Sequence, residues 1–300
     1  MALSVQATVY TYITLDVDAS VGYATQGRGI NDYGDVAGRY RDQTTMAYSF
    51  LYSGGTYTPF HDPTQGQTIA YGINNNKEIV GLLSKSGTTS HGFLLSGGTY
   101  SAIQVGTYYT QALDINNNTQ AKIVGFYTNA GINIGFLYNG SSYSDIQVTG
   151  ATETIPRCIN DSGVVTGYYK LSGGAYHGFL YQNGSFLDTS FDVTLPGAWN
   201  TRPTSINNLG QVVGSYQDVG GNGHGFVYDG VQFTTFELAG ITYSAPEGIN
   251  EAGQIAGGFT DGSGATHGFL ATPVPLPAAL WLFGSGLAAI GVFKRKYRSQ

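Results

Sequence analysis

Short runs of apolar residues alternate with polar, glycine-rich turns along most of the chain, and two markers recur within this pattern. An Ile-Asn pair recurs in register in six copies, at steps of 43, 42, 44, 47 and 43 residues: Ile30-Asn31, Ile73-Asn74, Ile115-Asn116, Ile159-Asn160, Ile206-Asn207 and Ile249-Asn250. A phenylalanine follows each pair in phase, at Phe50, Phe93, Phe136, Phe179, Phe226 and Phe269. Two markers that keep one period over six copies indicate an array of structural repeats.

The fifth copy shows how one repeat is predicted to fold. Apolar and aromatic positions alternate in short segments, which is typical of half-buried strands, and the Asn, Asp and Gly residues between them favour tight turns. One predicted strand ends at Ile206, and three more cover 211–216, 224–228 and 232–236, with turns at 207–210 and 229–230 and a loop at 218–223. Four antiparallel strands in about 43 residues is the size of one β-propeller blade.

The two ends of the array predict how it closes. The sixth copy stops after His267-Gly268-Phe269-Leu270 without a fourth strand, whereas Thr8–Ile13 has the strand pattern of Gly55–Phe60. An N-terminal strand that completes the last blade would remove the open strand edges. We therefore predict an all-β, six-bladed β-propeller over residues 1–272. An open β-solenoid is the competing fold, and it would not need this N-terminal strand.

Four of the six phenylalanine markers are preceded by His-Gly: His91-Gly92-Phe93, His177-Gly178-Phe179, His224-Gly225-Phe226 and His267-Gly268-Phe269. Tyr48-Ser49-Phe50 and Ile134-Gly135-Phe136 depart from this pattern. With these segments the repeats resemble the HAF family of extracellular repeats over about residues 28–270. The resemblance implies an exported, surface-associated protein and brings no known chemistry with it.

Composition and charge agree with an exported β-rich protein. The chain has 45 Gly, 23 Tyr and 15 Phe among 300 residues, and only 11% of its residues are charged. Its formal net charge is −6, but four of the 13 basic residues lie in the last seven positions, which leaves a charge of −10 on the rest of the chain. An acidic body argues against a nucleic-acid-binding surface. The single cysteine, Cys158, excludes an internal disulfide and is expected to be a small buried residue.

The C-terminal segment predicts a membrane anchor. Residues 274–293 contain no charged side chain and are followed at once by Lys294, Arg295, Lys296 and Arg298. As a helix, such a segment would rise about 30 Å, the thickness of a bilayer's hydrocarbon core. The basic cluster would stay in the cytoplasm, so the rest of the chain would lie outside. A buried core helix is the alternative, but a helix apolar on all faces favours lipid.

Three parts of this tail occur in a characteristic order: Val274-Pro275-Leu276-Pro277-Ala278, an apolar stretch containing Gly284-Ser285-Gly286, and the basic end. The tail, which we assign to residues 273–300, resembles the PEP-CTERM sorting signal in its VPLPA variant, with Leu276 where the name-giving pattern has Glu. The resemblance implies export, transient anchoring in the inner membrane, and processing by an exosortase in a Gram-negative bacterium that makes exopolysaccharide.

The chain shows no clear catalytic, cofactor or metal motif. The marker histidines belong to separate repeats, so bonds to a neighbouring strand or turn are favoured over a shared metal ion. Asn31–Gly34 and Asn160–Gly163 resemble fragments of a calcium loop, but they lack its several carboxylates, so plain turns are favoured over Ca²⁺ sites. Asp114 is the only acidic residue directly before a marker Ile, and the second carboxyl that glycoside hydrolysis needs is not evident.

One aromatic residue is a candidate glycan contact. The connection 194–203 lengthens the fourth step to 47 residues and carries Trp199. An exposed Trp on such a loop could stack on a sugar ring, although ordinary variation in loop length is the simpler explanation.

Together these features predict an exported, exosortase-sorted surface or matrix protein with a structural or adhesive role in an exopolysaccharide or biofilm. The expected partners are the sorting enzyme, transiently the inner membrane, and exopolysaccharide, with no nucleic acid. A carbohydrate-active enzyme or a lectin-like glycan binder that uses the channel mouth is the alternative. We favour the structural role because a repeated, low-charge unit suits a scaffold better than a single active site.

Overall fold

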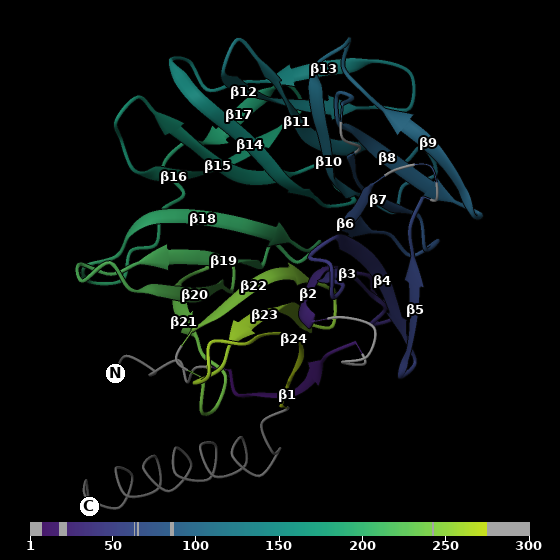
Figure 1. Cartoon of the computed structure of the whole chain (residues 1–300). Coiled ribbons are helices and arrows are strands. Elements are labelled where there is room, and N and C mark those ends of the chain that lie inside the picture. The colour runs from purple at the N-terminus through teal and green to yellow at the C-terminus, as the bar shows by residue number, and fades with distance from the viewer. Residues whose placement is uncertain are drawn as a thin grey trace, which may run out of the picture.

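The computed structural model describes residues 8–17, 23–62, 64, 66–84, 87–241 and 243–274. Within these ranges every regular element is a β-strand, and the strands form units of four arranged around a central axis (Figure 1). The innermost strand of each unit contacts the innermost strands of both neighbouring units, and the last contacts the first. The predicted all-β propeller is therefore confirmed, and the open solenoid is excluded.

Units one, two and five are separate antiparallel sheets. Unit one contains β2 (Tyr23–Ile30), β3 (Val36–Arg41), β4 (Ala47–Ser53) and β5 (Thr56–Phe60). Unit two contains β6 (Gln67–Ile73), β7 (Ile79–Ser84), β8 (His91–Ser96) and β9 (Thr99–Ile103). Unit five contains β18 (Trp199–Ile206), β19 (Val212–Gln217), β20 (Gly223–Tyr228) and β21 (Phe233–Phe236), close to the predicted limits.

Units three and four together form one eight-stranded sheet, because a single parallel bridge between Asn133 and Glu153 joins them. Unit three contains β10 (Tyr109–Ile115), β11 (Ile123–Asn129), β12 (Ile132–Tyr138) and β13 (Tyr143–Ile146). Unit four contains β14 (Ala151–Ile159), β15 (Val165–Leu171), β16 (Tyr176–Gln182) and β17 (Ser185–Asp188).

The sixth unit combines an N-terminal strand with three strands of the last repeat, as predicted. It contains β22 (Ser244–Ile249), β23 (Ile255–Thr260), β24 (Thr266–Pro273) and, as its outermost strand, β1 (Tyr10–Leu15). β1 pairs antiparallel with β24 from Tyr10 opposite Pro273 to Leu15 opposite Gly268. Because β1 covers the edge of β24, the backbone groups of that edge are hydrogen-bonded within the molecule.

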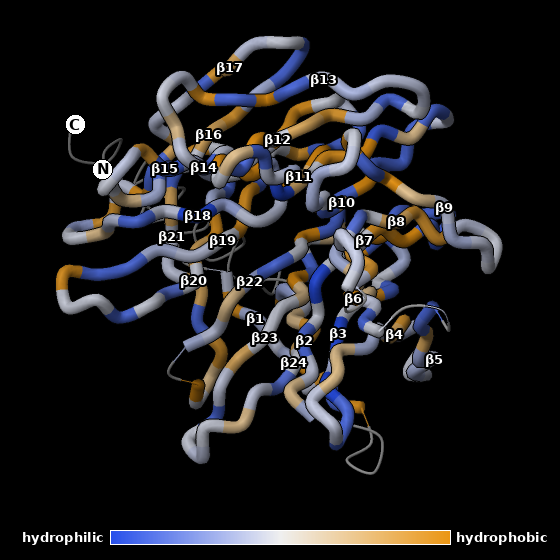
Figure 2. Tube along the Cα trace, turned by 45° about the horizontal axis from the view of Figure 1, so that its top comes forward, coloured by the Kyte–Doolittle hydropathy of each residue, from blue (hydrophilic) through white to orange (hydrophobic). Residues whose placement is uncertain are grey.

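The hydrophobic core lies between neighbouring units. One cluster joins Val213, Val227 and Phe236 of unit five to Ile255 and Phe269 of unit six. Hydrophobic and hydrophilic positions alternate along the strands (Figure 2), as expected when successive side chains point to opposite faces of a sheet. All six marker phenylalanines are fully buried in this core.

Each marker phenylalanine lies opposite a glycine of the second strand of its unit. The six pairs are Gly38 and Phe50, Gly81 and Phe93, Gly125 and Phe136, Gly167 and Phe179, Gly214 and Phe226, and Gly257 and Phe269. At Gly81, an added Cβ would lie 2.6 Å from the Phe93 ring and 2.0 Å from the carbonyl oxygen of Ile69. The glycine therefore leaves the space that the ring and the innermost strand occupy.

The predicted anchor falls almost entirely outside the described residues. Of the segment 274–293 only Val274 is described, and the basic cluster after it is not. In the part of the chain that the structure describes, no helix is long and apolar enough to cross a membrane.

Candidate functional site

A closed ring of hydrogen bonds links the six units at the axis. The side-chain amide of each marker Asn donates to the backbone carbonyl of the marker Asn in the next unit. The donor–acceptor distances, starting from Asn31 and going round through Asn74, Asn116, Asn160, Asn207 and Asn250 back to Asn31, are 3.2, 3.3, 3.3, 3.1, 3.1 and 3.0 Å. All six side chains are buried. The marker asparagines therefore connect units as well as forming turns.

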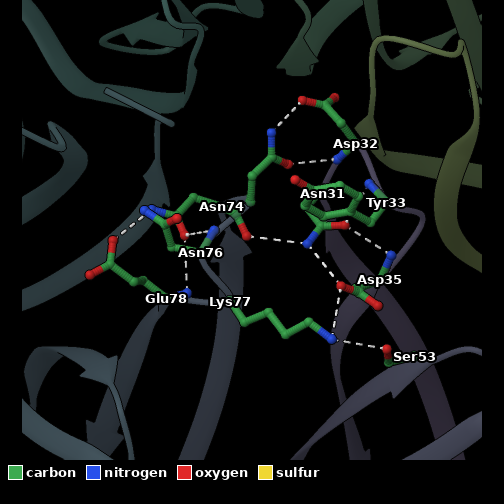
Figure 3. Close-up of polar contacts among 10 residues, drawn as sticks. Asn31, Asp32, Tyr33, Asp35, Ser53, Asn74, Asn76, Lys77 and Glu78 are labelled. Carbon is green, nitrogen blue, oxygen red and sulfur yellow. Dashed lines mark hydrogen bonds and ion pairs between the residues drawn. The ribbon is translucent and has the colours of Figure 1, made fainter. Parts of the chain in front are cut away.

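The same asparagines also hold the turns that follow the innermost strands (Figure 3). The Asn31 Oδ1 atom accepts hydrogen bonds from the backbone N–H groups of Tyr33 and Asp35, and Asn74 does the same for Asn76 and Glu78. This is the side-chain-to-backbone bonding for which Asn is favoured in turns. The predicted turns are thus confirmed. Among the described residues there is no cluster of three potential metal-ligating side chains.

A second ring surrounds the axis one residue further on. In this ring the backbone N–H of one residue donates to a side-chain oxygen of the corresponding residue in the next unit. The six residues that form the ring are Asp32, Asn75, Asn117, Asp161, Asn208 and Glu251. Three of these six residues are acidic, so this mouth of the axial channel carries negative charge. We call it the acidic mouth.

Every innermost strand contains a β-bulge at the same place, two residues before its marker Ile. The strand register shifts around one extra residue in each unit: Arg28, Tyr71, Leu113, Arg157, Thr204 and Glu247. A bulge turns a side chain away from its regular direction, and these six residues all line the axial cavity. Unlike the asparagines, they differ in type from unit to unit, so the chemistry of the axis is decided here.

Three of the bulge residues form an ion-pair cluster. A guanidinium nitrogen of Arg28 lies 3.1 Å from one carboxylate oxygen of Glu247, and one of Arg157 lies 2.7 Å from the other. The side chains of Arg28, Arg157 and Glu247 are only 14%, 15% and 18% exposed, respectively. The cavity they line has a volume of about 70 Å³, room for a few water molecules. A sugar could therefore bind at a mouth of the channel but not within its narrow part.

Asp114 and Cys158 lie in this narrow part. Asp114 Oδ2 accepts a hydrogen bond from the backbone N–H of Ile159 at 2.9 Å, and burial raises the pKa of this carboxyl to about 6. Cys158 is a free, buried cysteine, as predicted, and its Sγ lies 3.5 Å from Ser205 Oγ. Burial, reinforced by the neighbouring Asp114, raises the pKa of the Cys158 thiol well above its ordinary value.

Three marker histidines bind carboxylates, so their predicted role in holding turns and strands is confirmed. His177 Nδ1 lies 2.7 Å from Asp192, and His224 Nε2 lies 3.2 Å from Asp218. His267 lies between two carboxylates, at 2.7 Å from Asp16 and 3.3 Å from Asp261. These acidic partners were not predicted from the sequence. An Asp six residues before the His in repeats five and six was the available signal.

The position of Trp199 in the long connection had suggested that it lies in a loop, but it lies in a strand. It is the first residue of β18, so the longer connection ends before it. Its indole Nε1 donates to the backbone carbonyl of Asp218 at 2.7 Å, and the residue is 48% exposed. Trp199 lies at the end of β18 remote from the acidic mouth and outside the axial cavity.

The comparisons with known protein families identify the tail. The family model described as the PEP-CTERM protein-sorting motif matches residues 273–296. This confirms the sorting signal predicted from the VPLPA sequence, the apolar stretch and the basic end, and a signal of this kind is recognised by an exosortase. No curated protein matches the chain.

Solved structures identify the fold of the body. A lectin from Aleuria aurantia in complex with Fucα1-6GlcNAc is similar with a TM-score of 0.55 and 11% identity, over 86% of this chain and 99% of that chain. Another structure of this lectin, described as a six-bladed β-propeller, gives the same values. Trypanosoma rangeli sialidase has a TM-score of 0.50 and 8% identity, over 92% of this chain and 58% of that chain. At such low identity the likeness shows the propeller fold alone.

Proposed function

We propose that this chain is an exported, exosortase-sorted protein of the cell surface or extracellular matrix, with HAF-type repeats and a structural or adhesive role in an exopolysaccharide or biofilm. The observation that carries the proposal is the sorting motif at residues 273–296, directly after the last strand of a closed propeller. In the proposal the tail anchors the protein transiently in the inner membrane of a Gram-negative bacterium until it is processed.

The build of the propeller supports a scaffold. Two rings of hydrogen bonds join the units at the axis, and β1 covers the sheet edge that the last repeat leaves open. Such a molecule presents a folded, repetitive surface, and the edge of β24 cannot pair with another chain because β1 occupies it. In this proposal its exposed face binds the polymer without catalysing any reaction on it.

The intact mass of the protein from native cells, separated into membrane, surface and medium fractions, tests the proposal. We expect the surface or medium form to lack the tail that carries the matched motif, residues 273–296. A full-length species confined to the inner membrane would instead mean a plain C-terminal anchor, and the matrix role would be abandoned.

A glycan-active protein is the second candidate, because one carboxyl at the axis has a property that acid catalysis needs. Burial raises the pKa of Asp114 to about 6, within the range useful to a general acid near neutral pH. However, its Oδ2 atom is already bonded to the backbone of Ile159, inside the narrow part of the channel. This favours lectin-like binding over catalysis, with Trp199 as a second candidate contact. Any turnover of native exopolysaccharide that Asp114→Asn abolishes would favour the enzyme.

A further inference from the structure

Basic side chains gather around the bulge ring although the body of the protein is acidic. Arg28 and Arg39 both donate to the Oε1 atom of Gln26, each at 3.0 Å. Arg28 and Arg157 share the carboxylate of Glu247. These residues come from units one, four and six, so the three units bring their charges together only at the axis.

A second group of cations continues this cluster in units four and five. The Arg202 guanidinium lies 4.0 Å from the ring centre of Tyr176, and Lys170 Nζ lies 5.0 Å from the same centre. Tyr168 interacts electrostatically with both groups of cations. Burial raises the pKa of its hydroxyl, and the positive charges of Arg157 and Arg202 oppose that rise. We call the whole set of five cations the basic mouth: Arg28, Arg39, Arg157, Lys170 and Arg202.

The basic mouth lies on the side of the bulges away from the acidic mouth. Gln26 and Arg202 each come two residues before a bulge residue in their strands, whereas the marker asparagines come three residues after it. The two ends of the channel therefore differ in charge.

The cations of the basic mouth exceed its carboxylates. Among the described residues, two acidic side chains face the five cations, namely Glu247 and Glu153, which accepts from the Tyr176 hydroxyl at 3.2 Å. The Nε atoms of Arg28, Arg157 and Arg202 are buried and have no hydrogen-bond partner among the described residues. Excess charge with unsatisfied donors in a half-buried site is costly unless an anion compensates it.

We propose that the basic mouth binds a carboxylated glycan, a polymer segment with uronate-type carboxylates, which lies across this end of the channel. The proposal rests on the matrix role proposed above. Guanidinium groups form paired, charge-assisted hydrogen bonds with carboxylates, which explains a cluster made mainly of arginine. The half-buried rings of Tyr71, Tyr168 and Tyr176 lie among these cations, and in the proposal their exposed edges contact the sugar ring. The narrow cavity keeps the sugar at the mouth while its carboxylate points toward the arginines.

Glu247 gives the site a signature that damage to the fold would not reproduce. Its carboxylate already occupies Arg28 and Arg157, so it competes with a carboxylate of the ligand. Removing its charge by Glu247→Gln should strengthen binding of an anionic glycan, whereas removing a cation by Arg202→Gln should weaken it. Two substitutions at one site with opposite effects are not expected from a loss of structure.

The test uses the full-length chain in detergent, titrated with oligogalacturonate, with the carboxyl-reduced neutral oligomer as the matched ligand. We expect Arg202→Gln to weaken binding about tenfold, as loss of one charge-assisted contact does. We expect Glu247→Gln to tighten binding, and added salt to weaken it. Lys122→Gln makes the same change of charge as Arg202→Gln, in the turn after Asn116 at the other end of the channel, and should leave the affinity unchanged.

Equal affinity for the neutral oligomer, an equal loss in Lys122→Gln, or no binding at all would overturn the proposal. Displacement of the glycan by inorganic sulfate at equal concentration would also overturn it, because the site would then recognise any small anion. The matrix role fails separately: it is lost if the cellular protein keeps its tail, whatever the titration shows. A processed surface protein that does not bind oligogalacturonate would refute only the glycan proposal.

Discussion

Each axial asparagine has two tasks that no other side chain can combine in the same space. Its carbonyl oxygen accepts the N–H groups of its own turn, and its amide donates to the next unit. Asp could accept but not donate, while Gln would place both groups one methylene further away. This explains why Asn is present in all six units, whereas the bulge residue three positions earlier is of five different types among the six units.

Asn74→Ala should therefore lower the free energy of unfolding by about 2–4 kcal/mol, because it leaves two turn N–H groups and one buried carbonyl without a partner. Chemical denaturation of the full chain measures the loss. The control is Asn76→Ala in the same turn, where the side chain is exposed and the backbone N–H keeps its bond to Asn74. That control should stay within about 0.5 kcal/mol of the wild type. Equal losses in both variants would contradict the ring as a source of stability.

At the scale of the element, the second and third strands of each unit fit together through a glycine and a phenylalanine. Phe93 is fully buried and lies opposite Gly81, where the backbone carbonyl of Ile69 leaves no room for a Cβ. The strand pattern predicted both strands, but it did not predict this pairing. The glycine that follows two apolar residues in the second strand, as Gly214 follows Val212-Val213, was the available signal.

Gly81→Ala should destabilise the protein by about 3 kcal/mol or more, since overpacking moves either the Phe93 ring or the innermost strand. Gly262→Ala is the matched control, because an added Cβ there meets no atom within 4 Å. Thermal unfolding of both variants gives the comparison. If Gly81→Ala unfolds at the same temperature as the wild type, Gly81 is not closely packed against Phe93 and Ile69.

At the scale of the whole molecule, the ring depends on contacts between residues far apart in the chain. Asp16, just after β1, lies 2.7 Å from His267 on β24, a separation of 251 residues in the sequence. Burial lowers the pKa of His267, but its bonds to Asp16 and Asp261 outweigh this effect and raise the pKa above its usual value. The charged form of this histidine is therefore stabilised by folding.

The sign of this shift predicts how the closure responds to pH. A histidine with a raised pKa in the folded state stabilises the fold fully below its unfolded pKa, near 6.5, and this contribution is lost as pH rises through the folded pKa. A double-mutant cycle with His267→Gln, Asp16→Asn and both should give a coupling of about 0.5–1 kcal/mol at about pH 5.5, because the pair is partly exposed. At about pH 9 the coupling should fall toward zero. A coupling that is constant over this range would show that the charge of His267 does not contribute.

Sequence by itself determined the repeat, the strand pattern, the closure by an N-terminal strand, and the sorting tail, because each is carried by local spacing or by a contiguous motif. The tertiary structure decided what lies at the axis. Arg28, Arg157 and Glu247 are far apart in the chain and occur at positions with no common residue type, so no periodicity marks them. They meet because a bulge at the same place in each innermost strand turns one side chain into the channel. Only the closed ring brings these charges within hydrogen-bonding distance of one another.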